Sequence, residues 1–188
     1  MKAIQKHYPG DADHIIASTD LQYGKISIDT RFARTSKNPV DKRLDFCAYF
    51  LALIKTLDIR GESFDTIRKI CLEVVTDFVK RIPAMLINTS FARVFLKVFN
   101  KRVSSNSNPE GFIANIITDK VETYGFGYGI DIIECGICKL FAKHQYQKFS
   151  PILCEVDEIT SGLAGLKLIR TGTIALGAKK CDFRFKKM

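Results

Sequence analysis

The spacing of the hydrophobic residues changes near residue 110, and this change constrains the fold more than any other feature of the chain. Over residues 63–82 apolar side chains recur at every third or fourth position, which is the spacing of one face of an α-helix. Residues 41–58 and 88–102 predict two further helices, the first of them apolar on most sides. Beyond residue 110 apolar and polar residues alternate in short runs, which predicts strands.

Antiparallel hairpins are predicted for the second part of the chain. The glycine-rich turn Tyr124–Gly129 joins the first two strands, and Ser150-Pro151 is a favourable helix start after a helix over residues 136–146. Helices that cluster beside hairpins indicate an α+β fold, in which a helix-rich N-terminal part packs on an antiparallel sheet of about four strands. The predicted strands are residues 112–118, 130–134, 166–174 and 181–186.

Residues 1–40 predict an N-terminal arm, and residues 41–188 predict a single domain. The arm contains turn-forming residues at Tyr8–Asp11 and Thr35–Pro39, with one short helix over residues 10–18. A chain of 188 residues with 46% hydrophobic content can form one domain with a sizeable core. Its six cysteines are therefore not needed as disulfides.

The net charge of +9 is spread along the chain and mixed with acidic residues. This distribution favours a basic surface that attracts anionic small molecules over nucleic-acid binding. The longest apolar run, Phe46–Ile54, has nine residues, whereas a membrane-spanning helix needs about 20. The first ten residues hold no apolar signal core, so we expect a cytoplasmic protein with cysteines as thiols and no membrane contact. A homodimer is a possible assembly.

The segment Glu134–Cys138 concentrates reactive residues at a strand-to-helix junction. Cys135 and Cys138 form a Cys-x-x-Cys pair, and a thiol in the first turn of a helix has a lowered pKa because it lies at the positive end of the helix dipole. Such a pair suits nucleophilic, redox or metal-binding chemistry. The alternative is two small buried residues that close a tight junction.

Cys154, Asp157, Glu158 and Ser161 are expected to share one face of the helix that begins at Ser150. Acidic residues at this spacing usually belong to a solvated face. Cys154 on the same face is unusual, and it makes this helix a second candidate site.

Arg170 is expected among apolar neighbours, because alternation places it on the same face of its strand as Leu166 and Leu168. A buried guanidinium needs an anionic partner. Either a substrate carboxylate or an internal acid fulfils this need. On the next strand Cys181 shares a face with two phenylalanines and is expected in the same interior. The internal candidates are Glu134, Glu155 and Asp157.

We expect no cofactor and no metal ligand. A structural zinc site is the alternative, since four cysteines occur in the last third of the chain, but zinc ribbons need two Cys-x-x-Cys pairs and this chain has one. The four are Cys135, Cys138, Cys154 and Cys181.

Four C-terminal segments, in this order, resemble the L-2-amino-thiazoline-4-carboxylic acid hydrolase family, and the resemblance is densest over residues 130–185. It implies hydrolytic opening of the ring of 2-amino-thiazoline-4-carboxylate to give N-carbamoyl-cysteine. The chain is remotely similar to vinyl-reductase-type ligand-binding domains, which can hold zinc, but it has Arg170 and Thr173 where those domains have a glutamate and a cysteine ligand. The four segments are Glu134–Leu140, Pro151–Asp157, Arg170–Ala175 and Cys181–Arg184.

The resemblance implies roles for the candidate residues. Arg170 would bind the substrate carboxylate, and Glu134 or Asp157 would bind the amidinium or activate water. One of three thiols would attack the electrophilic ring carbon, unless water attacks it directly. A non-catalytic sensor of small organic acids is the alternative function. The candidate nucleophiles are Cys138, Cys135 and Cys154, and the remaining substrate-binding candidates are Thr171, Thr173 and Cys181.

Overall fold

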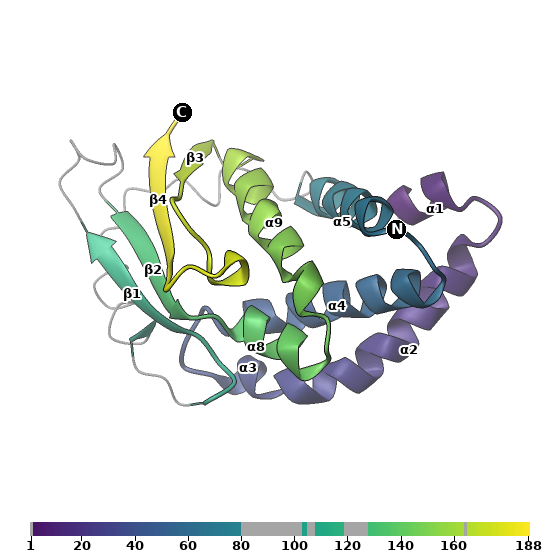
Figure 1. The fold of residues 1–188 in the computed structure, drawn as a ribbon, viewed down its shortest axis with the longest axis horizontal. Helices are drawn as coiled ribbons and strands as arrows, with labels where there is room; N and C mark the ends of the chain where they lie inside the picture. The colour runs from purple at the N-terminus through teal and green to yellow at the C-terminus, as the bar shows by residue number, and fades with distance from the viewer. Residues whose placement is uncertain (1, 80–102, 105–107, 119–127, 164) are drawn as a thin grey trace.

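The computed structural model describes residues 2–79, 103–104, 108–118, 128–163 and 165–188. Helices lie beside a four-stranded antiparallel sheet with the strand order β1-β2-β4-β3, which confirms the predicted α+β class (Figure 1). The strands are β1 (Ile113–Thr118), β2 (Tyr128–Glu134), β3 (Leu166–Ile169) and β4 (Cys181–Lys187).

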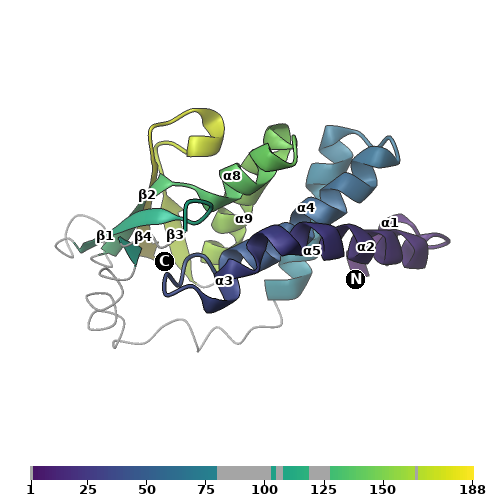
Figure 2. The same ribbon diagram turned by 90° about the horizontal axis from the view of Figure 1, so that it is seen from below.

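Helix α9 lies between the sheet and the helical part of the molecule, in contact with α5 on one side and with β3 on the other (Figures 1 and 2). Helix α8 leads from the end of β2 to the start of α9. The helices are α1 (Lys2–His7), α2 (Ala12–Thr30), α3 (Phe32–Thr35), α4 (Arg43–Ile59), α5 (Phe64–Val79), α8 (Gly136–Lys143) and α9 (Ser150–Leu163), with 3₁₀ turns η2 (Gln147–Phe149) and η3 (Ile174–Leu176).

Helix α4 forms the centre of the helical part, as its nearly continuous apolar sequence predicts. Phe50, Leu51 and Leu53 are each at most 1% exposed, so successive positions around the helix are all covered. A helix that is hydrophobic on every side is stable only when other elements enclose it. Helices α2, α5 and α8 provide this enclosure.

The N-terminal region contains a longer helix than the sequence predicts for the arm. The short helix predicted over residues 10–18 extends as α2 to Thr30, and α2 packs along α4 (Figures 1 and 2). Ile4, Ile15 and Ile26 are completely or almost completely buried in the common core. A domain that begins at residue 41 would expose the apolar surface of α4 that these residues cover. The domain boundary at residue 41 stays a prediction, which a truncation experiment would test.

One face of the sheet carries the apolar side chains that meet the helices. The register pairs Ile116 with Ile130 and Ile130 with Phe183, and the next row pairs Ile132 with Cys181. The opposite face is polar at its centre. There Asp131 forms ion pairs with Lys180 and Arg184, and Arg184 Nη2 lies 2.8 Å from Asp131 Oδ1. Within the described residues, the helices therefore cover the apolar face of the sheet.

Several element boundaries depart from the pattern. Strand β3 ends at Ile169 rather than residue 174, because the Asp182 carboxylate accepts hydrogen bonds from the backbone N–H groups of Thr171 and Gly172, each at 3.0 Å, and turns the chain away. Helix α8 ends at Lys143, two residues before Gln145 takes a left-handed φ of 64°. The helix predicted over residues 88–102 and most of the turn Tyr124–Gly129 lie outside the described residues.

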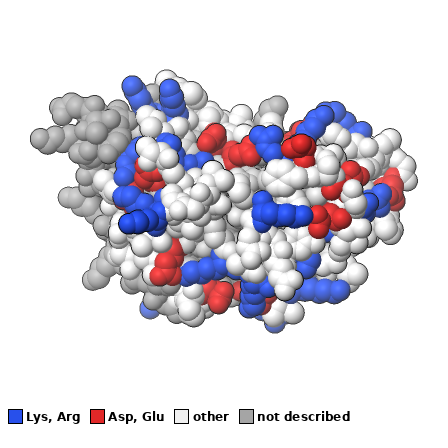
Figure 3. All heavy atoms as spheres, viewed as in Figure 1, with Lys and Arg blue, Asp and Glu red and all other residues white. Residues whose placement is uncertain are grey.

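Surface charge agrees with the mixed distribution in the sequence. Basic and acidic side chains alternate over the coloured part of the face in Figure 3. Within the described ranges, every helix is too short or too polar to cross a bilayer.

Candidate functional site

A cavity of about 400 Å³ lies between the apolar face of the sheet and helix α9, with α8 and the start of α4 completing its wall. Its volume falls within the range of roughly 300–1000 Å³ that is typical of small-molecule sites. The lining residues are Pro39, Val40, Arg43, Phe112, Ile130, Ile132, Cys135, Ile137, Cys138, Ser150, Leu153, Cys154, Asp157, Thr160, Ser161, Cys181, Phe183 and Phe185.

Two regular elements place their side chains along the cavity. Helix α9 contributes residues three or four positions apart over its whole length, from Ser150 to Ser161, which is the spacing of one helix face. Strand β4 contributes every second residue from Cys181 to Phe185. The cavity therefore runs lengthwise between one helix and one strand.

Four thiols line this cavity. Cys135 and Cys138 come from the start of α8, Cys154 from the middle of α9 and Cys181 from the start of β4. The fold thus brings together all four cysteines of the last third of the chain. All six cysteines of the protein are free.

Close packing at Gly136 brings the first turn of α8 near to its neighbours. A Cβ atom on this glycine would lie 3.1 Å from the Glu110 carbonyl oxygen, 3.1 Å from the Phe112 ring and 3.2 Å from the Leu44 side chain. Because Gly136 has no side chain, the first turn of α8 packs directly on α4 and on the segment that precedes β1. Cys138, two residues later, is held in this turn at the cavity wall.

The first turn of α8 gives Cys138 the most acidic thiol of the four. The thiol of Cys135 hydrogen-bonds to Cys138 and lowers its pKa, and the Ser150 hydroxyl acts in the same direction. The N-terminal end of the helix dipole also favours a thiolate here. The same hydrogen bond, together with burial, raises the pKa of Cys135 well above its usual value. The hydrogen bond and the helix dipole thus both favour a thiolate at Cys138.

The other two thiols favour the protonated form. Burial raises the pKa of Cys154 to about 11, although the adjacent Thr173 hydroxyl and the Arg170 charge act against this shift. Burial also raises the pKa of Cys181, whose sulfur accepts a hydrogen bond from the Ile174 N–H at 3.2 Å. Among the four cavity thiols, the pKa is thus lowered for Cys138 and raised for Cys135, Cys154 and Cys181.

An ion-pair cluster lies beside the thiols, centred on Asp157. Arg43 donates to Asp157 Oδ1, and Arg170 Nη1 lies 3.8 Å from Asp157 Oδ2. The side chain of Arg43 is 50% exposed and lines the cavity, whereas that of Arg170 is 8% exposed. The Asp157 charge raises the pKa of Arg43 further. Among the described residues of the cavity wall, Arg43 thus provides a half-exposed cationic side chain.

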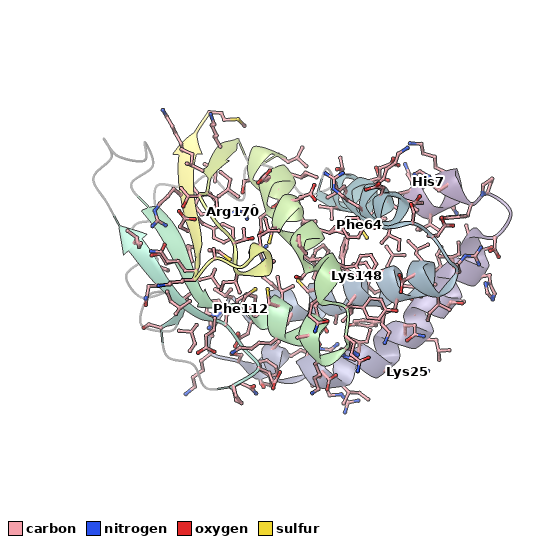
Figure 4. The ribbon with its side chains drawn as sticks, in the orientation of Figure 1. His7, Lys25, Phe64, Phe112, Lys148 and Arg170 are labelled. Atoms are coloured by element: carbon pink, nitrogen blue, oxygen red, sulfur yellow. The ribbon has the colours of Figure 1, made fainter. Side chains whose placement is uncertain are left out.

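Arg170 lies between the sheet and α9, where Figure 4 labels it, and it does not form part of the cavity wall. It donates to the Cys154 carbonyl oxygen at 3.2 Å and to Glu158 at 3.0 Å, and its guanidinium lies 5.2 Å from the centre of the Phe183 ring. The expected internal ion pair therefore exists, with Asp157 and with the exposed Glu158 as partners. Arg170 is therefore placed to hold the Asp157 carboxylate in position rather than to line the cavity.

Three other candidates lie away from the cavity surface. Glu134 is paired with Lys139, which also donates to the Pro109 carbonyl oxygen. The Thr171 hydroxyl donates to Asp182 at 2.6 Å on the polar side of the sheet. Thr173 is buried next to Cys154 and contacts the site through that thiol.

Arg43 is a candidate site residue that the sequence pattern did not reveal. It is the first residue of α4, a helix that draws attention for its apolar content. Its partner Asp157 is separated from it by 114 positions. One feature of the sequence could have pointed to Arg43. It is a basic residue at the start of a helix that must be enclosed, and its charge has to meet an anion or solvent.

The cavity thiols do not converge on one point. Among the residues that the structure describes, no group of three or more His, Cys, Asp or Glu side chains is arranged to hold a metal ion. That the protein holds no metal or cofactor stays a prediction, which elemental analysis would test against the zinc alternative.

Comparison with known proteins gives one match. The family model of L-2-amino-thiazoline-4-carboxylic acid hydrolase matches residues 43–185. This range begins at Arg43 and includes all the residues of the cavity wall except Pro39 and Val40. Neither a curated protein nor a solved structure matches the chain.

Proposed function

The chain belongs to the L-2-amino-thiazoline-4-carboxylic acid hydrolase family, and from this we propose that it hydrolyses a 2-amino-thiazoline-4-carboxylate-like acid to an N-carbamoyl-cysteine-like product. The observation that supports this most is the position of Cys138. Its thiol combines a lowered pKa with a place in the wall of a cavity that also contains Arg43 and Asp157. A nucleophile, a cation for the carboxylate and a carboxylate for proton transfer thus face one space.

The proposed reaction proceeds through a covalent intermediate. The Cys138 thiolate adds to ring carbon 2, which bears the amino group, and the bond from this carbon to the ring sulfur breaks. The ring sulfur leaves as a thiolate and takes up a proton. Water then adds to the same carbon, and the Cys138 thiolate leaves. One water molecule is consumed and no atom changes oxidation state overall, which agrees with hydrolysis.

Arg43 and Asp157 would orient the substrate. The exposed side of the Arg43 guanidinium binds the substrate carboxylate, since a guanidinium can donate two parallel hydrogen bonds to such a group. Asp157 binds the amidinium-like nitrogen atoms or accepts a proton from the attacking water. Arg170 acts as a positioning residue, because it holds Asp157 from the side opposite the cavity.

The test is a titration of released thiol after incubation of the purified protein with 2-amino-thiazoline-4-carboxylate. We expect turnover by the native protein and a loss on the order of a thousandfold in Cys138→Ser, because a hydroxyl is a far weaker nucleophile at neutral pH. Cys71→Ala is the matched control, since Cys71 is buried in α5 away from the cavity and should leave turnover unchanged. Mass spectrometry of a rapidly acidified reaction should detect the adduct on Cys138.

The outcomes separate the alternatives. Binding of the acid without thiol release would contradict the hydrolase proposal and support a sensor of small acids. Turnover by Cys138→Ser at the native rate would leave the hydrolase proposal intact but would replace the covalent route by direct attack of water.

A further inference from the structure

The cavity is much longer than a single thiazoline ring. Cys138 and the Ser150 hydroxyl interact at one end, and Ser161 lines the cavity eleven residues further along α9, a distance of roughly 16 Å at about 1.5 Å per residue. Strand β4 gives an independent value. From Cys181, which is close enough to influence Cys138, to Phe185 the strand extends roughly 13 Å at about 3.3 Å per residue.

Both measures describe the same direction. Strand β3 packs against α9, and its Leu168 pairs with Phe185 on β4. Phe185 and the last part of α9 therefore lie at the same end, opposite the thiols. The volume leads to the same conclusion, because about 400 Å³ would hold roughly a dozen water molecules at about 30 Å³ each. A five-membered ring with a carboxylate and an amino group fills only part of this space.

The end away from Cys138 is chiefly apolar. Ile130 pairs with Phe183 across the sheet, and the ring of Phe183 stacks with that of Phe185 at a centroid distance of 6.2 Å. Opposite them are the hydroxyl groups of Thr160 and Ser161. The charged pair Arg43–Asp157 belongs to the middle, since Asp157 lies between Ser150 and Ser161 on α9. An apolar wall of this kind stabilises an alkyl or aryl group and disfavours a second charge.

We infer that the substrate carries an apolar alkyl or aryl substituent on ring carbon 5, next to the carbon that bears the carboxylate. This inference rests on the proposed function. With carbon 2 at Cys138 and the carboxylate at Arg43, carbon 5 is the ring atom that faces away from the thiol end. A group attached there extends along α9 toward Phe183 and Phe185.

The experiment compares 2-amino-thiazoline-4-carboxylate with its 5-phenyl derivative. We expect kcat/KM for thiol release to be at least tenfold higher for the 5-phenyl acid, mainly through a lower KM. Calorimetric titration of the Cys138→Ala protein, which should bind without turnover, should give a Kd at least tenfold lower for the same compound.

A variant at the far end ties this preference to the cavity. Ser161→Trp places an indole in the space that the substituent would occupy, and it should reduce the tenfold preference to none. Gly162→Trp is the matched control, because a Cβ atom at Gly162 on the same helix meets no atom within 4 Å and the residue is not part of the cavity wall. This control should keep the full preference.

Equal or weaker turnover and binding of the 5-phenyl acid would overturn the inference, while turnover of the unsubstituted acid would still support the hydrolase. If neither acid is turned over, the hydrolase proposal fails. The two Kd values alone then show whether the cavity prefers a ligand with the apolar substituent. A preference that survives Ser161→Trp would also contradict the inference, since the substituent would then lie elsewhere.

Discussion

Cysteines occur in two regions of this protein, and a thiol with a lowered pKa is found in one of these regions. Cys47 and Cys71 lie in the helical part, where burial raises the pKa of each thiol to about 12. The four cysteines between α8, α9 and the sheet line a cavity, and one of them has a lowered pKa. Burial alone therefore makes a thiol inert, whereas a thiol beside a hydrogen-bond donor and a hollow space can react.

The packing of the two regions explains this difference. In the helical part, apolar side chains of α2, α4 and α5 fill the interior, and most residues of α4 are buried. Between α9 and the sheet, an ion pair, hydroxyl groups and thiols replace part of the apolar surface. Charged groups need partners or solvent, so this interface does not close completely.

The largest expected difference between the regions is in stability. Leu51→Ala, in the centre of α4, should lower the free energy of unfolding by about 2–5 kcal/mol, because it leaves a cavity in filled space. Phe185→Ala should cost less, since its partly exposed ring already borders a hollow. Urea denaturation of both variants measures this. An equal or greater loss for Phe185→Ala would show that the sheet interface is packed as tightly as the helices.

Alkylation rates test the contrast between the thiols directly. With iodoacetamide at pH 7, Cys138 should react on the order of a hundredfold faster than Cys47 and Cys71, because the thiolate is the reactive form. Its lowered pKa also predicts that this reactivity persists to lower pH than in a free cysteine and is lost as the pH falls through that pKa. Peptide mass spectrometry over time gives each rate. Modification of Cys154 before Cys138 would contradict the proposal that Cys138 is the nucleophile.

The two arginines at Asp157 provide a smaller, kinetic comparison. Arg43→Met should raise KM for the thiazoline acid roughly thirtyfold, which corresponds to about 2 kcal/mol of lost charge-assisted hydrogen bonding. Arg170→Met should lower kcat more than it raises KM, because Arg170 supports Asp157 from behind. Arg34→Met, at an exposed pair with Asp45, is the control that should change neither constant. A greater KM effect for Arg170→Met would restore the carboxylate role that the sequence suggested for it.

The smallest expected effect concerns the link between the regions at Asp29. Lys143 hydrogen-bonds to Asp29 of α2 and lowers its pKa, with His144 of α8 acting in the same direction. A depressed carboxyl pKa stabilises the fold above the unfolded value of about 3.9 and is lost as the pH falls through the folded value. Asp29→Asn should therefore cost about 0.5–1 kcal/mol at pH 7 and nothing at pH 2. The same cost at both pH values would exclude an electrostatic origin.

The sequence predicts those parts of the fold in which one element carries a strong pattern. Helices α4 and α5 and all four strands follow from periodicity, because each buries a continuous stripe or face. Helix α2 is missed over much of its length, since its buried positions Ile15, Thr19 and Ile26 are interrupted by polar and small residues. Its stability comes from packing along α4, which a local pattern does not contain.

The candidate site divides in the same way. The α8 thiols and the α9 face are visible locally, whereas the choice among the thiols depends on hydrogen bonds that only the fold creates. The exchange of roles between Arg43 and Arg170 depends on a contact across more than half the chain. The cavity itself is space that several elements leave between them, so no single segment predicts it.

The missing side chain at Gly136 has a consequence for how this site could change during evolution. A methyl group there would lie 3.1 Å from Phe112 and 3.2 Å from Leu44, so these side chains or the start of α8 would have to shift by a few tenths of an ångström. Exchanges at the aromatic end of the chamber would leave this packing untouched. Enlarging residue 136, in contrast, would move the first turn that carries Cys138.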